Sequence, residues 1–441
     1  MTTHAPDEIE TAEQGEPGAS PMSGAAAALR LLLGLAVVSV VFVMLGWGIL
    51  LLVILAIIVM VLLHEFGHFF TAKRSGMKVT EFFVGFGPRL WSVRKGETEY
   101  GVKAIPAGGY CRIIGMTSAE EVHPSDEPRA YRNQAFPKRI IVASAGSAMH
   151  LVIAFLLAFG ALALIGRPDP SIVVVSSFLD LGGAGTTPAQ SAGVAPGDRI
   201  VAIDGQTISS TGQMSKVVHR SSGRPLTVTV ERAGKERELT VTPIDGRTVT
   251  VDGQPLAPTT GPSRGYLGVS LTEGSSRLGP WAALTQSGSI VAQATSGAVT
   301  GIVHLFSPSG LTHYASQVAH PTATGSSASS SPQSGRPESI IGAVRTADQA
   351  AHAGALPLIE VFISLNIFIG VINMLPMLPL DGGHVAIAAY EWVRTRRGRP
   401  RYQADVTKMM PVVYAFLAFL LVLVSTSMYL DIAHPAANPF R

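Results

Sequence analysis

Cysteine is almost absent from this sequence, since Cys111 is the only one among 441 residues. No intrachain disulfide can form between these residues, and a zinc site built from several cysteines is excluded. Charged residues are also scarce, at 14%, whereas hydrophobic residues make up 47%. This balance excludes one soluble globular domain and predicts a polytopic membrane protein that carries soluble parts.

The formal net charge is also small, at +3. No aromatic-rich basic surface is evident, so we expect no nucleic-acid partner. The Lys and Arg residues concentrate in two stretches, 71–138 and 391–410. The positive-inside rule places both stretches in the cytoplasm, which requires an even number of membrane crossings between them. The apolar runs Ile140–Ile165 and Leu356–Leu380 supply two crossings.

The first apolar run, Ala25–Phe70, is much longer than the roughly 20 residues that one helix needs to cross a bilayer. Gly46-Trp47-Gly48 offers a break near its middle. Either an interfacial helix precedes one span or two spans form a hairpin, and we favour the hairpin. With a last span at Pro411–Leu430, the sequence predicts four core or five transmembrane helices.

Two soluble parts interrupt the spans. The stretch TEYGVKAIPAGGYCRIIGM alternates in strand fashion and predicts a membrane-associated β-loop in the cytoplasm. After the second core span, the chain changes to Thr/Val alternation with turns at Pro196-Gly197-Asp198, Asp204-Gly205 and Ala233-Gly234. These patterns predict a mixed α/β module outside the cytoplasm.

The resulting organisation has nine parts. We expect a disordered acidic tail (1–23) without the basic start of a secretory signal, a membrane segment or pair of segments (24–70), a cytoplasmic loop with a β-hairpin (71–138), a transmembrane helix (139–167), the soluble module (168–260), an extracytoplasmic linker of partly low complexity (261–355), a transmembrane helix (356–390), a basic cytoplasmic loop (391–410) and a last transmembrane helix (411–432).

The motif HEFGH closes the first apolar run. On a helix, His64 and His68 project from one face, one turn apart, and two such imidazoles can share a zinc ion. Glu65 is then placed to activate water as a general base. HExxH also occurs by chance, but ionisable groups at membrane depth are costly and are therefore functional candidates.

A catalytic zinc site needs a third protein ligand at the same depth as these histidines. Asp381 ends another apolar span just before the second basic loop, so it meets that requirement. His384 is the alternative, one helical turn away, but it could simply meet lipid headgroups. We therefore predict Zn²⁺ ligation by His64, His68 and Asp381. We expect no metal-binding role for the other histidines considered. His150 is expected to be a packing or hydrogen-bonding residue, and His304, His313 and His320 are expected to be solvated.

With this pairing, the sequence resembles the bacterial site-2 proteases, which are intramembrane zinc metalloproteases. HEFGH fits their HExxH, and NMLPMLPLDGG fits their N-x-x-P…L-D-G segment. GFGPRLWSVRKGETEYGVKAIPAGGY resembles their first cytoplasmic loop, and PAQSAGVAPGDRIVAIDG resembles their PDZ domain. Their G-P-x-x-N motif is altered here, because His150 stands where the family has Asn, and no GLGF-like carboxylate loop precedes Ala189.

The resemblance implies cleavage of transmembrane substrates, such as anti-sigma factors or remnant signal peptides, in a bacterial plasma membrane. The active site would lie toward the cytoplasm and the PDZ domain outside. Glu65 would take a proton from water and pass it to the leaving amine. An edge of the 99–115 loop could hold the substrate extended, and Asn373 could donate to the substrate backbone or the oxyanion, although helix packing would also explain its amide.

Two other classes of protein compete with this interpretation. A non-catalytic receptor with a PDZ module would tolerate loss of Glu65, yet both HExxH and LDG are intact. A zinc transporter would need polar residues along several spans, whereas His64, His68 and Asp381 gather at one end. Partners are therefore expected to be transmembrane proteins and membrane lipid.

Overall fold

The computed structural model describes residues 24–116, 120–180, 185–248, 250–251, 254–255, 258, 262–320, 337–395 and 402–440. The expected acidic tail (1–23) and most of the Ser-rich stretch lie outside these residues. The chain divides into two compact units, Met1–Phe155 with Val291–Arg441 (unit 1) and Leu156–Ile290 (unit 2).

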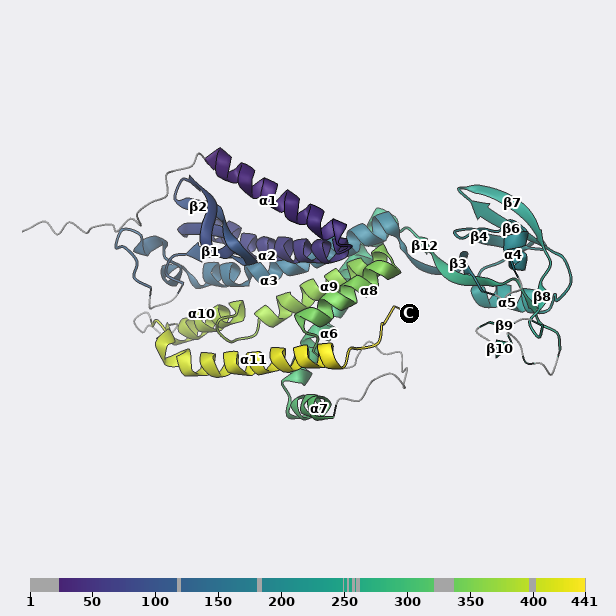
Figure 1. Cartoon of the computed structure of the whole chain (residues 1–441). Helices are drawn as coiled ribbons and strands as arrows, with labels where there is room; N and C mark the ends of the chain where they lie inside the picture. The colour runs from purple at the N-terminus through teal and green to yellow at the C-terminus, as the bar shows by residue number, and fades with distance from the viewer. Residues whose placement is uncertain are drawn as a thin grey trace, which may run out of the picture. The chain divides into compact units, whose positions relative to one another are not determined.

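Four helices of the described chain are long and apolar enough to cross a membrane, which supports a polytopic membrane protein. They are α2 (Gly48–Arg74), α3 (Phe136–Gly160, continued by a π-helical turn at Ala161–Ile165), α9 (Ala355–Asn373) and α11 (Met410–Ala433). In Figure 1, the axes of α2, α3 and α11 are roughly parallel, and the chain runs along α2 in the opposite direction to α3 and α11. Their outward faces expose Leu, Val and Ile side chains, as lipid contact requires.

The first apolar run forms two helices, α1 (Gly24–Met44) and α2, separated at the expected break around Gly46. Gly46 has a φ of 77°, a left-handed conformation that glycine adopts without steric cost. Helix α1 turns back and contacts α2 and strand β1. A long curved hairpin, β1 (Val79–Lys95) and β2 (Thr98–Ile113), follows α2 and lies between α1 and α2 in Figure 1.

Small elements join this hairpin to the next helix. They are the 3-10 turns η1 (Glu127–Arg129) and η2 (Tyr131–Asn133). A cluster that includes Ala72, Met77, Ile113, Tyr131 and Val142 packs the end of α2, the hairpin, η2 and α3 around one core. This core holds the segment between α2 and α3 against the helix that carries the HExxH motif.

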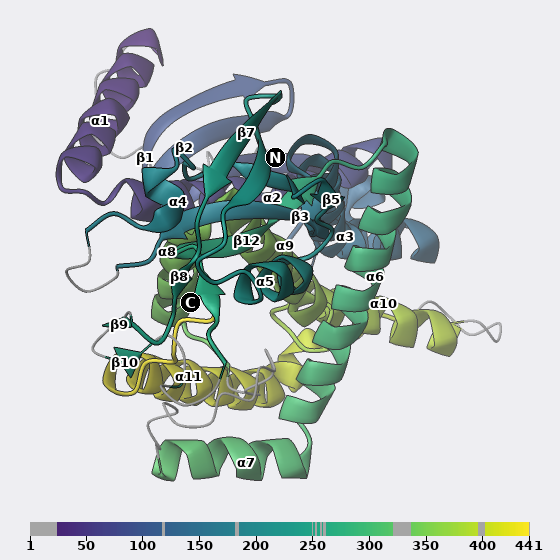
Figure 2. The same cartoon turned by 90° about the vertical axis from the view of Figure 1, so that its right-hand side faces the viewer.

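The stretch 261–355, which the sequence analysis treats as a linker, contains helices that the sequence did not predict. They are α6 (Pro280–Leu305), α7 (Pro308–Ala319) and α8 (Ile340–Ala353). Figure 2 shows α6 running into α7 through a sharp bend, which measures 77°. The α6–α7 pair passes the length and hydropathy test for a span when taken together, which allows a fifth crossing.

After α9, the chain turns through 374–380 and enters α10 (Asp381–Thr395), and the 3-10 turn η4 (Val406–Met409) leads into α11. Gly382 lies against the carbonyl oxygens of Met374 and Leu375, where a Cβ would collide with backbone. Glycine at this position therefore allows the first turn of α10 to pack closely against the backbone that follows α9.

Unit 2 is built on an antiparallel sheet with the order β12-β3-β4-β6-β7, and β5 pairs with β4. The main strands are β3 (Arg167–Phe178), β4 (Arg199–Ile203), β5 (Gln206–Thr207), β6 (Leu226–Arg232), β7 (Lys235–Val241) and β12 (Val269–Ser276). Short pairs are β8 (Ile244–Asp245) with β11 (Gly265–Tyr266) and β9 (Thr250–Val251) with β10 (Gln254–Pro255).

Helices α4 (Pro188–Ser191) and α5 (Thr211–His219) complete unit 2 around an aliphatic core that includes Val175, Ile203 and Val228. The predicted turns at Asp204-Gly205 and Ala233-Gly234 are present, with positive φ at both residues of each turn. That pairing is typical of tight two-residue hairpins.

Candidate metal centre

The HExxH residues lie on the last turns of α2, and Gly67 of the same helix packs directly on the backbone of α3 at Ala145. His64 and His68 are both buried, at 7% and 8% exposure. Their Nε2 atoms are 3.3 Å apart, so the two imidazoles converge on one point as the i, i+4 spacing predicts.

Asp381, the first residue of α10, completes the cluster. Its Oδ2 lies 3.5 Å from His64 Nε2 and 3.3 Å from His68 Nε2. In the described part of the chain, these three side chains form the one group of His, Cys, Asp or Glu residues with the spacing of a metal site. Zinc with ligands at roughly 2.0–2.1 Å in a tetrahedron requires ligand atoms about 3.3–3.4 Å apart. The observed separations match that requirement.

The backbone of α3 orients His68 and leaves space beside the two histidines. His68 Nδ1 lies 2.7 Å from the carbonyl oxygen of Val142 on α3, so the ring donates through Nδ1 and presents Nε2 as a ligand. Gly146, one turn further along α3, leaves open the space where the two rings meet. A Cβ there would lie 2.6 Å from His64 Nε2, so a larger residue would occupy the ligand position.

Asp381 has a second polar neighbour, because Ser147 Oγ lies 3.5 Å from its Oδ2. Asp381 therefore meets α3 through Ser147 and meets α2 through the two histidines. The N-terminal end of a helix also favours a carboxylate, since unpaired backbone N–H groups point outward there. Helix position and contacts thus place a carboxylate beside the two histidines.

His384 points to a different environment. Its ring lies 6.4 Å from the ring of Tyr131 in an edge-on arrangement, and it lines a small cavity with Arg139 and Glu391. It is not part of the His64, His68, Asp381 cluster. Of the two third-ligand candidates, Asp381 is the one whose oxygen reaches the histidines.

Glu65 is half-buried beside strand β2. A Cβ at Gly109 would lie 3.6 Å from Glu65 Cγ, so the hairpin passes over the carboxylate-bearing side chain. Asn373 is the last residue of α9, so Asn373 and Asp381 flank the turn 374–380. It is half-buried.

His150 lies near the cluster, and the structure shows its burial and its contacts. It is 1% exposed, its ring centroid is 5.0 Å from that of His64, and its Nδ1 lies 3.1 Å from Asn366 Oδ1. Asn366 donates its amide N–H to Phe362 O, which orients its Oδ1 toward His150. The expected hydrogen-bonding role of His150 fits these contacts. His304, His313 and His320 are exposed.

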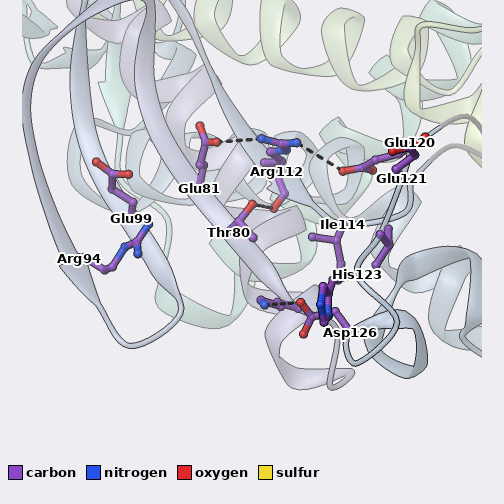
Figure 3. Close-up of a pocket in the computed structure, with 12 residues that line it drawn as sticks. Thr80, Glu81, Arg94, Glu99, Arg112, Ile114, Glu120, Glu121, His123 and Asp126 are labelled. Carbon is purple, nitrogen blue, oxygen red and sulfur yellow. Dashed lines mark hydrogen bonds and ion pairs between the residues drawn. The ribbon is translucent and has the colours of Figure 1, made fainter. Parts of the chain in front are cut away.

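A cavity of about 220 Å³ lies away from this cluster, lined by the hairpin and the segment that follows it. Figure 3 shows Arg112 between Glu81 and Glu120 there, and Lys78 pairs with Asp126 at 2.6 Å. These oppositely charged side chains of the lining pair with one another.

Fold and site together define a membrane-embedded protein with an HExxH metal centre. The chain belongs to peptidase family M50, the site-2 proteases, which it matches over residues 52–420. It is 35% identical over 411 residues to the zinc metalloprotease Rip1 of Mycobacterium tuberculosis, covering 88% of this chain and 96% of that protein. It is 34% identical over 425 residues to Rip1 of Mycolicibacterium smegmatis, covering 90% and 98%.

Proposed function

We propose that this chain is an intramembrane zinc metalloprotease in which His64, His68 and Asp381 hold the metal and Glu65 carries the proton. The observation that carries the proposal is the convergence of three ligand atoms, 3.3–3.5 Å apart, from two helices in unit 1. Family membership and the names of the relatives supply the reaction class. Zinc bound there would polarise a peptide carbonyl and lower the pKa of water toward about 7.

The other steps of the reaction are assigned to residues of the chain itself. Glu65 accepts a proton from water as general base and returns it to the leaving amine as general acid. Val142 O keeps His68 in the tautomer that presents Nε2. Asn373 is proposed to donate its amide N–H to the substrate backbone or to the developing oxyanion.

A substrate helix must unwind before its amides can reach this site, because its backbone groups are hydrogen-bonded to one another. Strand β2 belongs to a two-stranded sheet, and Gly109 places it beside Glu65. We propose that an extended substrate adds to this hairpin as a further strand, which would hold the scissile bond near Glu65.

The substrates are proposed to be single-span remnants of the anti-sigma factor or signal peptide type, cleaved in a bacterial plasma membrane. Lys73 and Arg74 at the end of α2 and Arg394 at the end of α10 support a cytoplasmic placement of the metal centre. On that topology, unit 2 lies outside the cytoplasm. Its mixed fold and the sequence PAQSAGVAPGDRIVAIDG support a PDZ domain.

Glu65→Gln tests this function directly. The amide keeps the size of the side chain and cannot act as the base, so cleavage of a transmembrane model substrate should fall below detection while zinc content stays at that of the wild type. Glu338→Gln is the matched control, because this exposed residue lies outside the site. Cleavage near the wild-type rate in Glu65→Gln would remove Glu65 from the mechanism.

A further inference from the structure

A buried ion pair joins α3 to α10 in unit 1. Arg139 Nη1 donates to Glu391 Oε2 at 2.6 Å, and the two side chains are only 8% and 10% exposed. The partners are 252 residues apart in the sequence. Surface ion pairs are common and weak, but a buried pair is retained only where both charges are well satisfied.

Further bonds fix each partner. Glu391 Oε1 accepts the backbone N–H of Ala404 at 2.6 Å, so the carboxylate also binds the segment before α11. Tyr131 donates its hydroxyl to the Arg139 carbonyl at 3.2 Å, and its ring lies 5.0 Å from the guanidinium. Burial raises the pKa of Tyr131 to about 12, so the hydroxyl keeps the proton that it donates.

The same turn of α3 also contacts α2, the helix that carries His64 and His68. Val142 follows Arg139 by three residues, hence on the same side of α3, and its carbonyl oxygen orients His68. Arg139 therefore secures the helix that begins with Asp381, while Val142 secures the helix that carries the histidines. Glu391 lies ten residues, or about 15 Å along α10, from Asp381.

We propose that Arg139 and Glu391 are positioning residues of the metal centre. Their pair fixes α10 against the first turn of α3 and so sets the distance between Asp381 and the two histidines. Neither side chain touches the ligand atoms, so the effect acts through the placement of α10. The inference rests on the proposed metal site and adds to it two residues outside the HExxH and LDG motifs.

A small polar cavity lies at the pair. It measures about 20 Å³ and is lined by Arg139, His384 and Glu391 together with Tyr131 and Gln403. The buried Nε of Arg139 has no hydrogen-bond partner among the described residues. A space of this size accommodates one water molecule, which would complete the bonds of the guanidinium.

The test is Co²⁺ affinity of the full-length protein in detergent, measured by competition with a chelator together with the visible absorption of the bound ion. Glu391→Gln and Arg139→Gln should each weaken Co²⁺ binding about 10–100-fold, the range seen when outer-sphere partners of metal ligands are removed. The absorption of any bound Co²⁺ should change as the carboxylate ligand shifts. Glu391→Asp should give an intermediate affinity.

Asp126→Asn is the matched control, because its ion pair with Lys78 has the same 2.6 Å separation but lies on the hairpin cavity. It should leave Co²⁺ affinity unchanged. A single variant of a buried pair can fail to fold because one charge is left unpaired. The double variant Arg139→Met/Glu391→Leu contains no unpaired charge and should fold, yet bind Co²⁺ more weakly than the wild type.

Wild-type affinity in a folded single or double variant would overturn the positioning role. Equal losses in the Asp126→Asn control would also overturn it, since the effect would then be general destabilisation. If the wild-type protein itself does not bind Co²⁺, or if His64→Ala binds it equally well, the proposed metal site fails and the positioning role fails with it.

Discussion

Buried polar side chains have different roles in unit 1 and in unit 2. In unit 2, Asp198 is completely buried but serves its own fold: it accepts bonds from Arg232 at 2.6 Å and from the Ala195 N–H at 2.8 Å. Although burial raises the pKa of Asp198, the bonds from Arg232 outweigh it and hold the pKa below its ordinary value. Thr187, also buried, caps α4 through Gln190 N–H.

In unit 1, buried polar side chains converge from separate helices. His64 and His68 meet Asp381, His150 meets Asn366, and the partners in each pair are more than 200 residues apart in the sequence. Such long-range polar contacts inside a membrane protein are costly to assemble. The comparison teaches that buried polar side chains gather around one point at the proposed reaction site, whereas elsewhere they form helix caps and isolated pairs.

The largest effect that would test this contrast is loss of a ligand. Asp381→Ala should weaken zinc binding by more than the roughly 10–100-fold expected for an outer-sphere change, because two histidines alone do not complete the site. His384→Ala should keep zinc, because its ring faces Tyr131. Metal content after dialysis against a chelator measures both. The reverse result would make His384 the ligand.

Gly146→Ala tests whether the space beside the histidines matters. The added Cβ would lie 2.6 Å from His64 Nε2, so we expect zinc affinity to fall about tenfold or more, as for other changes next to metal ligands. Gly160→Ala is the control on the same helix, since nothing lies within 4 Å of a Cβ there. Equal zinc affinities in the two variants would show that Gly146 is not needed for metal binding.

Removing most of unit 2 should separate the two units functionally. Phe178 of β3 pairs with Val269 of β12, so an Asn-Gly turn can replace 179–268 and still close that ladder. All proposed site residues belong to unit 1, so zinc affinity should stay within about twofold of the wild type, a difference of about 0.4 kcal/mol.

The same deletion tests a role for unit 2 as a size filter for substrates. We expect the shortened protein to cleave a substrate whose outer domain has been removed, and also to cleave the full-length form. A folded, zinc-loaded deletion variant that cleaves neither substrate would instead make unit 2 a required docking domain.

Glu97 should give the smallest effect. Hydrogen bonds from Arg129, at 2.6 and 2.9 Å, together with Lys73 hold the pKa of Glu97 at about 2, below its ordinary 4.5. Its stabilising effect is therefore complete above about pH 4.5 and is lost as the pH falls through 2. Because the pair is partly exposed, Glu97→Gln should lower stability at pH 7 by about 1 kcal/mol or less.

Thermal unfolding at pH 7 and at pH 3 measures the Glu97 effect, and the difference between variant and wild type should shrink at the lower pH. Zinc affinity should not change, since Glu97 joins the hairpin turn to α2 and η1. A large loss of zinc would show that the hairpin turn and the metal centre are more strongly coupled than these contacts indicate.

Sequence reasoning predicted those parts of the proposed site that follow a local rule. The spacing of His64 and His68 on a helix brings both imidazoles to one face, and Asp381 follows closely on the apolar run that contains α9. The four helices that are long and apolar enough to cross a membrane fall within the long apolar runs of the sequence. Turns such as Ala233-Gly234 followed from residues that tolerate positive φ.

The rest depends on contacts without a local signal. The bond from His68 to Val142 uses a backbone carbonyl, which every residue has, and the Arg139–Glu391 pair joins residues 252 apart. Helix α6 escaped prediction because its sequence mixes Gly, Ser and Thr with apolar residues and shows no clear stripe. These side chains weaken helix propensity, so tertiary packing decides the structure there.

The most direct test of the central claim is X-ray absorption at the zinc edge on the full-length protein. We predict two imidazole nitrogens and one carboxylate oxygen at about 2.0–2.2 Å, with the carboxylate contribution lost in Asp381→Ala and the spectrum unchanged in His384→Ala. A spectrum with three imidazoles, or one that does not change in Asp381→Ala, would contradict the assignment of His64, His68 and Asp381 as the zinc ligands.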